Sequence, residues 1–260
     1  MAGRGSDFVQ SLERGLAVIR AFDHDHPELT LSEVAAVTGV TRAVARRFLL
    51  TLADLGYVRN DGRFFSLTAK VLELGYAYLS SLSLPEVAEP HLEALVGEVN
   101  ESSSVSVLDG HDVVYVARVP VSRIMTVSIS VGTRFPAYAT SMGRVLLAGL
   151  PDDTLTEYLS TVRLERLTGR TVSSVAALRG ELVRVRAQGW SMVNQELEEG
   201  LRAVAVPVRD RSGRVVAAIN VSTHASRTSL PAMRREFLPP LLRAAAAVEG
   251  DLPWSRARRA

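Results

Sequence analysis

The sequence predicts an α+β protein built in two parts. In residues 8–55, apolar side chains recur at the three- and four-residue spacing of amphipathic helices. From about residue 102 onward, stretches that alternate in strand fashion are joined by tight turns, with helical stretches between and after them. This pattern is typical of an α+β domain with a mainly antiparallel sheet. At 260 residues and 47% hydrophobic content, the chain is long enough to bury two cores.

The first part has the pattern of a helix-turn-helix. A first helix is predicted over residues 8–22. Thr30 stands three residues before Glu33, which is the capping-box spacing that begins a helix, and Gly39 ends this second helix. Thr41 follows closely and can cap a third, longer helix. A short helix, a glycine-containing turn and a longer helix together form a helix-turn-helix.

A β-hairpin follows the third helix directly. Residues 57–59 and 63–67 read as two short strands around an Asp61–Gly62 turn. A hairpin in this place is a wing, and an apolar helical stretch continues behind it. The predicted boundaries are therefore 1–67 for a winged helix-turn-helix domain, 68–84 for a linker helix, 85–250 for a second domain and 251–260 for a short basic tail.

Three arginines lie in the first half of the third helix. On a helical wheel, Arg46 and Arg47 lie opposite an apolar side, with Arg42 at the edge. The apolar side consists of Ala45, Phe48, Leu49 and Leu52. A solvated helix face is the ordinary explanation for such arginines. In a helix-turn-helix, however, this half of the helix enters the DNA major groove, where arginine makes bidentate contacts with guanine. We therefore predict these DNA contacts: Ser32, Thr41, Arg42, Ala43, Arg46, Arg47 and Arg63.

The overall composition argues against several other classes of protein, among them disulfide-bonded and membrane-spanning proteins. The formal net charge is only +2, and the first 80 residues carry as many acidic as basic side chains, so any basic surface must be local. The absence of cysteine excludes disulfides and thiolate metal sites. No uncharged apolar run approaches the length of a membrane span, and no apolar signal segment follows the N-terminus. We expect a cytoplasmic protein without membrane association.

Two motifs could indicate an enzyme or a metal site. The stretch ATSMGR, residues 139–144, resembles a nucleophile elbow with Ser141 as the nucleophile. Alanine replaces the first glycine, however, and His224 is the only downstream histidine, so a serine hydrolase is a remote alternative. His24 and His26 are clustered in a polar loop without further partners at metal-ligand spacing. We therefore expect no catalytic residue, no metal and no cofactor.

The second part offers features of a small-molecule site. A helix is predicted to begin near residues 140–143, and the free amides at its N-terminus could hold an anion. Asn194, Asn220 and Ser222 place polar side chains in otherwise apolar strands, and the last two share a face. Ordinary exposed strand residues are an equally good explanation of this pattern.

Several long motifs, in this order, resemble the IclR family of bacterial transcription regulators. They are SLERGLAVIRAF, LTLSEVAAVTGVTRAVARRFLLTLADLGYV, FSLTAKVLELGYAYL, GTRFPAYATSMGRVLLAGLP and GLRAVAVPVRDRSGRVVAAINVST. Within the family, FVQSLERGLAVIRAF, RRFLLTLADLGYV and LELGYAYLSSLSLPEVAEPHLE resemble the subgroup that controls the β-ketoadipate pathway. Members of that subgroup respond to protocatechuate, 4-hydroxybenzoate or β-ketoadipate.

The resemblance implies a GAF-like effector-binding domain behind the winged domain and assembly as a homodimer or homotetramer. It places the effector contacts at Met142, Gly143, Asn194, Ala203, Asn220 and Ser222. Family members often carry an acid where Asn194 stands, a cysteine where Ala203 stands and a serine where Asn220 stands. The loss of the acid favours an anionic ligand, because like charges in a buried site repel.

Two residues just before the predicted helix complete the expected effector site. Arg134 is a candidate partner for a carboxylate and Tyr138 for an aromatic ring or a hydroxyl. An ion pair that holds a loop is the alternative role for Arg134. We expect a ligand-responsive, sequence-specific DNA-binding regulator of aromatic acid catabolism, with a double-stranded DNA operator and an aromatic or dicarboxylic acid as partners. The alternatives are an effector-binding module whose winged domain contacts proteins and, remotely, the hydrolase that uses Ser141.

Overall fold

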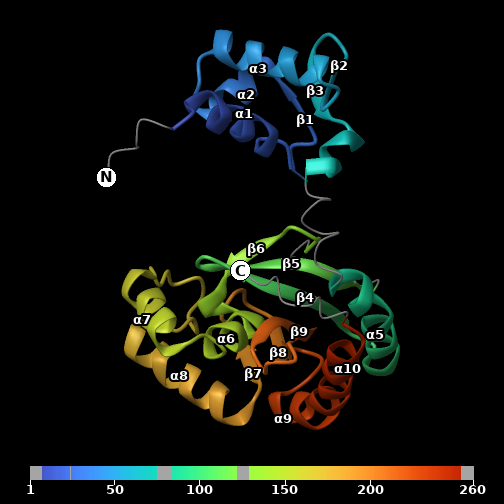
Figure 1. Cartoon of the computed structure of the whole chain (residues 1–260), viewed down its shortest axis with the longest axis vertical. Coiled ribbons are helices and arrows are strands. Elements are labelled where there is room, and N and C mark those ends of the chain that lie inside the picture. The colour runs from blue at the N-terminus through green and yellow to red at the C-terminus, as the bar shows by residue number, and fades with distance from the viewer. Residues whose placement is uncertain (1–7, 24, 75–83, 122–128, 253–260) are drawn as a thin grey trace. The chain divides into compact units, whose positions relative to one another are not determined.

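The computed structural model describes residues 8–23, 25–74, 84–121 and 129–252. The chain divides into two compact units, Met1–Ser81 and Leu82–Ala260, whose elements are labelled in Figure 1. The first unit is a small helical body with a short sheet, and the second contains a larger antiparallel sheet with helices on both faces. The predicted α+β class is confirmed.

The N-terminal unit is a winged helix-turn-helix. Its helices are α1 (Gln10–Arg20), α2 (Leu31–Thr38) and α3 (Arg42–Asp54). Its strands are β1 (Glu28–Thr30), β2 (Val58–Asn60) and β3 (Phe64–Leu67), in the order β1-β3-β2 with antiparallel pairing. The β2–β3 hairpin is the predicted wing. Strand β1, which extends the wing to three strands, was not predicted.

Local sequence signals determine where the two helices of the helix-turn-helix, α2 and α3, begin and where α2 ends. The Thr30 amide donates to Glu33 Oε2 at 2.7 Å, and the Glu33 amide donates to Thr30 Oγ1 at 3.4 Å, so the capping box predicted for α2 is present. Gly39 ends this helix with φ of +67°, a left-handed conformation that favours glycine. Thr41 then caps α3 by accepting the Val44 amide at 3.3 Å. The turn between the two helices is therefore encoded within a few residues.

One hydrophobic core holds the winged unit together. Ala45 and Leu49 of α3 are fully buried, Leu52 is 8% exposed, and Phe48 packs against the cluster from its edge. These are the four residues predicted for the apolar side of this helix. They pack with residues of α1, α2 and the wing, among them Val18, Val34, Val58 and Phe65. The opposite side of α3 is left for solvent or a partner.

The sheet of the C-terminal unit is entirely antiparallel. Its strands are β4 (Ser102–Asp109), β5 (Asp112–Val119), β6 (Arg134–Pro136), β7 (Ser191–Asn194), β8 (Leu201–Arg209) and β9 (Val215–His224). The strand order is β6-β5-β4-β9-β8-β7. Strands β4 and β9, which are far apart in sequence, therefore pair at its centre.

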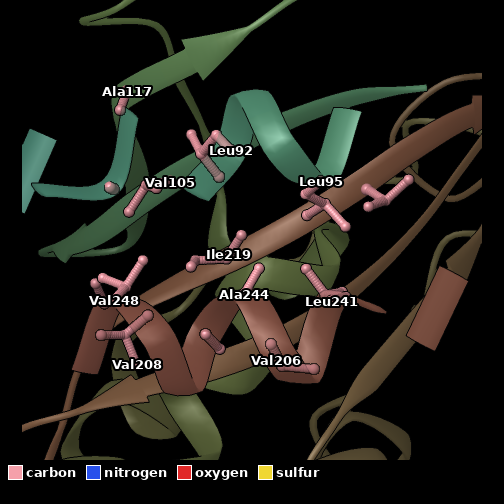
Figure 2. Close-up of a cluster of buried hydrophobic side chains, with 14 of the residues drawn as sticks. Leu92, Leu95, Val105, Ala117, Val206, Val208, Ile219, Leu241, Ala244 and Val248 are labelled. Carbon is pink, nitrogen blue, oxygen red and sulfur yellow. The ribbon is translucent and has the colours of Figure 1, made fainter. Parts of the chain in front are cut away.

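Helices cover both faces of this sheet. Helices α5 (Leu84–Val99) and α10 (Leu238–Asp251) pack on one face over a core that includes Leu92, Val105, Ile219 and Leu241 (Figure 2). A short α-helical turn α9 (Leu230–Ala232) and a π-helical turn η3 (Met233–Phe237) lead into α10. The other face carries the turn η2 (Ala137–Ala139) and helices α6 (Ser141–Ala148), α7 (Asp152–Thr161) and α8 (Val175–Gln188). We call these the α10 face and the α6 face.

Several predicted segments fall outside the described residues. Of the predicted linker helix over 68–84, the structure describes residues 68–74, where Ala69–Val71 form a 3-10 turn η1, and Leu84, the first residue of α5. Most of the basic tail at 251–260 lies outside them. His24, one of the two clustered histidines, also lies outside.

Candidate nucleic-acid interface and ligand site

The arginines of α3 form an exposed basic surface. Arg42, Arg46 and Arg47 are all exposed. Within the described residues, none of them forms an ion pair or a side-chain hydrogen bond, although several other arginines of the chain pair with a carboxylate. Their charges are therefore available to an anionic partner. Thr41, Ala43 and Ser32, the other predicted contacts on the two helices, are also exposed.

Arg47 differs from Arg46 in its surroundings. It lines a groove between α1 and α3 together with Arg14, Gln10 and Thr51, whereas Arg46 lies outside this groove. Arg14 has no ion pair with any described residue, so it adds a cation to this flank of α3. The sequence alone does not indicate Arg14, because the approach of α1 to α3 is a tertiary contact. Arg46 therefore belongs to the outward side of the helix, and Arg47 to its flank.

The wing presents a further arginine on a rigid turn. Asp61 Oδ1 accepts the amides of Arg63 at 2.9 Å and of Phe64 at 2.7 Å, and these hydrogen bonds hold the pKa of Asp61 below its usual range. The Arg63 guanidinium is exposed and lies over the Phe64 ring, 5.0 Å from its centroid. Arg59, the other wing arginine, instead donates to Ser66 Oγ at 2.7 Å. Of the two wing arginines, Arg63 is the one whose guanidinium forms no hydrogen bond or ion pair with a described residue.

The α6 face of the large sheet carries the polar side chains. Alternation along β4 and β9 sends Val105 and Ile219 to the α10 face and their neighbours to the α6 face. The α6 face therefore has a row of serines on β4 (Ser102, Ser104 and Ser106) beside Asn220 and Ser222 on β9. All five residues are buried. These central strands bring together the predicted Asn220 and Ser222, whereas the serines of β4 were missed.

Three buried hydroxyl groups on this side of the sheet, those of Ser141, Tyr158 and Ser222, have no hydrogen-bond partner among the described residues. Ser222 Oγ is buried and forms no hydrogen bond with any described residue, and the same is true of Ser141 Oγ at the start of α6. Asn220 uses its Oδ1 to accept the Ser104 amide at 3.1 Å. An unpaired buried hydroxyl has a free-energy cost of about 1–3 kcal/mol, so such groups are uncommon unless something else binds them. The two serines therefore indicate a polar ligand site.

Met142 and Gly143 are present at this site in different roles. Met142 is fully buried, and Ser106 Oγ donates to its sulfur at 3.2 Å. The Gly143 amide is already bonded to Thr140 Oγ1 at 2.9 Å, so it is not one of the free amides expected at the helix start. A Cβ at Gly143 would lie 2.1 Å from the Ala137 carbonyl oxygen. Gly143 allows α6 to pack against the preceding turn.

Three predicted effector contacts do not join this group. Arg134 is bound on the surface by Asp109, with Nη1 to Oδ2 at 2.7 Å, and by Asp112, so the structure favours its ion-pair alternative. The Tyr138 hydroxyl donates to the Glu165 carbonyl and accepts the Glu165 amide, both at 3.0 Å, which uses its hydrogen-bonding capacity within the domain.

Strand alternation places Asn194 on the other face of the sheet from Asn220 and Ser222. Val193 pairs with Ala203, and Ala203 pairs with Ser222, so these residues share the α6 face. Asn194 therefore lies on the opposite face, where its Oδ1 accepts Arg202 Nε at 2.7 Å. Of the eight predicted effector residues, the α6 side holds Tyr138, whose hydroxyl is bonded to Glu165, together with Met142, Gly143, Ala203, Asn220 and Ser222.

A further arginine, which the sequence patterns do not indicate, lies on the α6 face. Arg118 of β5 is half-buried, and its Nη1 donates to Ser104 Oγ at 3.1 Å. Ser104 and Arg118 are direct cross-strand neighbours, and Ser104 pairs on its other side with Asn220. The nearest signal in the sequence is a single charge inside the apolar stretch VVYVARV.

The geometry required of a serine hydrolase is absent from the described residues. Ser141 Oγ has no hydrogen-bond partner there, and the downstream His224 directs Nδ1 to Ser226 Oγ at 2.7 Å. A nucleophilic serine needs a base within hydrogen-bond reach. The described ranges also contain no group of three or more His, Cys, Asp or Glu residues able to hold a metal ion. None of the helices described is long and apolar enough to cross a membrane.

Comparison with known proteins places this arrangement in a family. Residues 11–62 match the IclR helix-turn-helix domain, and residues 76–249 match the C-terminal domain of bacterial transcriptional regulators of the IclR type. The chain belongs to the IclR family of bacterial transcriptional regulators, as its motifs indicated.

Individual relatives agree with this membership. The chain is 48% identical to the Pca regulon regulatory protein of Pseudomonas putida over 92% of this chain and 82% of that protein. It is similar to the solved structure of a candidate transcriptional regulator from Rhodococcus sp. RHA1, with a TM-score of 0.85, 60% identity and coverage of 94% and 98%. It also resembles an IclR homologue from Microbacterium hydrocarbonoxydans in complex with 4-hydroxybenzoate, with a TM-score of 0.82, 26% identity and coverage of 93% and 98%.

Proposed function

We propose that the protein is a ligand-responsive, sequence-specific DNA-binding regulator of genes for aromatic acid catabolism. The winged unit binds an operator in double-stranded DNA, and the α6 face of the second unit binds an aromatic or dicarboxylic acid such as protocatechuate, 4-hydroxybenzoate or β-ketoadipate. Residues 68–84 connect the two. The protein acts in the cytoplasm and catalyses no reaction.

The observation that carries the DNA-binding role is the unpaired set of cations on α3. Arg42, Arg46 and Arg47 are exposed and have no ion pair within the described residues. They lie at the N-terminal half of the second helix of a helix-turn-helix, the half that contacts base edges in the major groove. The first 80 residues have balanced charge overall, so DNA affinity depends on these few placed arginines.

The effector role is supported by the buried polar groups of the α6 face and by the relatives. Ser141 and Ser222 offer unused hydroxyl groups at a buried face. The Pseudomonas putida relative is a Pca regulon regulatory protein, and a similar structure holds 4-hydroxybenzoate. An acid that binds one arrangement of the protein better than another shifts DNA affinity by the same factor as DNA shifts acid affinity.

Assembly as a homodimer or homotetramer completes the proposal. A twofold axis presents two copies of α3 to successive major grooves, so we expect a roughly palindromic operator with half-sites about 10 base pairs apart, or a multiple of that spacing.

Binding of the full chain to its own promoter region tests this function. We expect nanomolar binding that competitor DNA of unrelated sequence does not abolish, and a change in affinity when protocatechuate, 4-hydroxybenzoate or β-ketoadipate is added. Arg46→Ala should weaken binding, whereas Arg211→Ala, which removes an exposed arginine of the other unit, should not. Equal affinity for promoter and unrelated DNA would favour a role for the winged domain in protein contacts.

A further inference from the structure

Arg118, near the end of β5, is a cation that has no carboxylate partner among the described residues. It stands in β5 between Ala117 and Val119 and is half-buried. No aspartate or glutamate of the described residues lies within ion-pair distance of it. The undescribed segments of this unit, 82–83, 122–128 and 253–260, contain no aspartate or glutamate in the sequence. Within the described part of the chain, no carboxylate side chain therefore balances this charge.

Burial without a counter-ion has an electrostatic cost. Desolvation lowers the pKa of Arg118 from its ordinary value, although an arginine remains charged at neutral pH. A buried charge is stabilised only when a partner of opposite charge or good hydrogen bonds replace its hydration. The single hydrogen bond that Arg118 makes to Ser104 satisfies one of its five donors. The free donors favour an anion.

A β-bulge turns this arginine to the ligand side of the sheet. Tyr115 pairs with Ser106, but Ala117 pairs with Val105, so the register between β4 and β5 shifts by one residue around Val116. Regular alternation from Tyr115, which packs on the α6 face, would send Arg118 to the α10 face. Because of the bulge, Arg118 instead lies opposite Ser104 on the α6 face. Bulges commonly re-aim a side chain next to a functional site.

The arginine completes a set of groups that an aromatic acid can bind. Arg118, Ser104 and Asn220 lie side by side on β5, β4 and β9, and Ser222 lies one pleat further along β9. Neighbouring strands are roughly 4.8 Å apart, so the row from Arg118 to Asn220 spans roughly 10 Å of the sheet. Ser141 and Ser222 supply unpaired hydroxyl groups.

Resting on the proposed function, we infer that Arg118 is the carboxylate anchor of the effector, with Ser104 as the residue that positions its guanidinium. The carboxylate accepts two hydrogen bonds from the free edge of the guanidinium, a geometry that arginine favours. The hydroxyls of Ser141 and Ser222 bind the polar groups at the other end of the acid. The anchor is thus distinct from Arg134, whose guanidinium is already bound by Asp109 and Asp112.

Matched acid and amide ligands test this assignment on the full chain. Isothermal titration with 4-hydroxybenzoate and with 4-hydroxybenzamide compares two molecules of similar shape that differ in charge. The wild-type protein should bind the acid at least about tenfold more tightly, because charge-assisted hydrogen bonds are about twice as strong as neutral ones. In Arg118→Gln, the acid should lose at least about tenfold in affinity while the amide changes little, so the preference disappears.

The controls separate this inference from the proposed function. Arg134→Gln removes another arginine of the same domain and should retain the preference for the acid. Arg118→Lys should recover part of it, since a point charge remains. Wild-type protein that binds acid and amide equally, or an Arg118→Gln variant that keeps the preference, overturns the anchor and leaves the regulator intact. If the wild-type chain binds its promoter but none of the hydroxybenzoates or β-ketoadipate, the proposed effector class fails, and the anchor with it.

Discussion

Arg144 and Glu196 form a buried, two-pronged ion pair that ties α6 to the connection between β7 and β8. Arg144 Nη1 donates to Glu196 Oε1 at 2.9 Å, and Nη2 contacts Oε2. The two side chains are only 3% and 13% exposed. Arg144 Nε also donates to the Tyr138 carbonyl at 3.0 Å, and Glu196 Oε2 accepts the Val172 amide at 3.2 Å. The pair therefore joins four segments on the α6 side of the sheet.

Loss of one member of this pair should destabilise the effector domain. Glu196→Ala leaves the Arg144 charge buried, and removal of one partner of such a pair costs about 3–5 kcal/mol. Glu236→Ala, which removes the exposed partner of Arg235, should cost less than about 1 kcal/mol. Urea unfolding followed by tryptophan fluorescence measures the difference, because both tryptophans of the chain, Trp190 and Trp254, belong to this unit. Equal effects of the two substitutions would contradict the structural role of the pair.

Two glycine substitutions should change stability in opposite directions. In Gly143→Ala, the new Cβ would lie 2.1 Å from the Ala137 carbonyl oxygen, so α6 must move and the domain should lose more than about 3 kcal/mol. In Gly180→Ala, on an exposed position of α8 with no atom within 4 Å of the new Cβ, the domain should gain about 0.5–1 kcal/mol from helix propensity. The same unfolding experiment measures both. A tolerated Gly143→Ala would show that α6 is not held closely against the preceding turn.

The unpaired serine hydroxyls should show opposite effects on stability and on ligand binding. Ser141→Ala and Ser222→Ala remove buried groups that lack a hydrogen-bond partner, so the melting temperature of the ligand-free protein should stay constant or rise. The rise in melting temperature caused by 4-hydroxybenzoate should become smaller, because a bound acid loses a partner. Ser160→Ala, on the exposed surface of α7, is the control and should change neither quantity by much. A large loss of stability without ligand would assign these serines to the fold alone.

Arg46 and Arg47 should contribute differently to DNA binding. Arg46, on the outward side of α3, should contact bases, so Arg46→Ala should cost about 1–3 kcal/mol on the promoter and little on unrelated DNA. Arg47, on the flank beside Arg14, should contact phosphate. Arg47→Ala should therefore weaken binding to both DNAs alike and reduce the salt slope by about one. Titrations at several salt concentrations test this, and identical profiles for the two variants would refute the division.

Local signals explain which parts of the fold the sequence predicted. The start of α2 depends on Thr30 and Glu33 and its end on Gly39, all within ten residues. The three-residue strands β1 and β6 have no such signal, because their pairing with β3 and β5 is decided by tertiary contacts. The alternation of polar residues in β9 indicated Asn220 and Ser222. The serines of β4 follow the same period of two, but Ser104 was not predicted from it.

The sequence pattern could not place Arg118 on the α6 face of the sheet. Its face depends on the register shift around Val116, and counting residues from Tyr115 gives the wrong side of the sheet. For Arg134, the sequence pattern suggested an effector contact that the strand pairing does not favour. It stands beside the helix start in sequence, yet Asp109 and Asp112 across the neighbouring strand turn bind its charge at the surface. Both outcomes depend on strand pairing, which a single charge in a sequence does not reveal.

The two faces of β4 have different tasks, since one packs in the core and the other is polar. Val105 and Val107 serve the core of the α10 face, while Ser102, Ser104 and Ser106 face α6. In the proposed function, substitutions at the serine positions change the polar lining of the effector site, while the packing on the other face remains. A one-residue insertion in the same strand would exchange the two sets and destroy both properties at once.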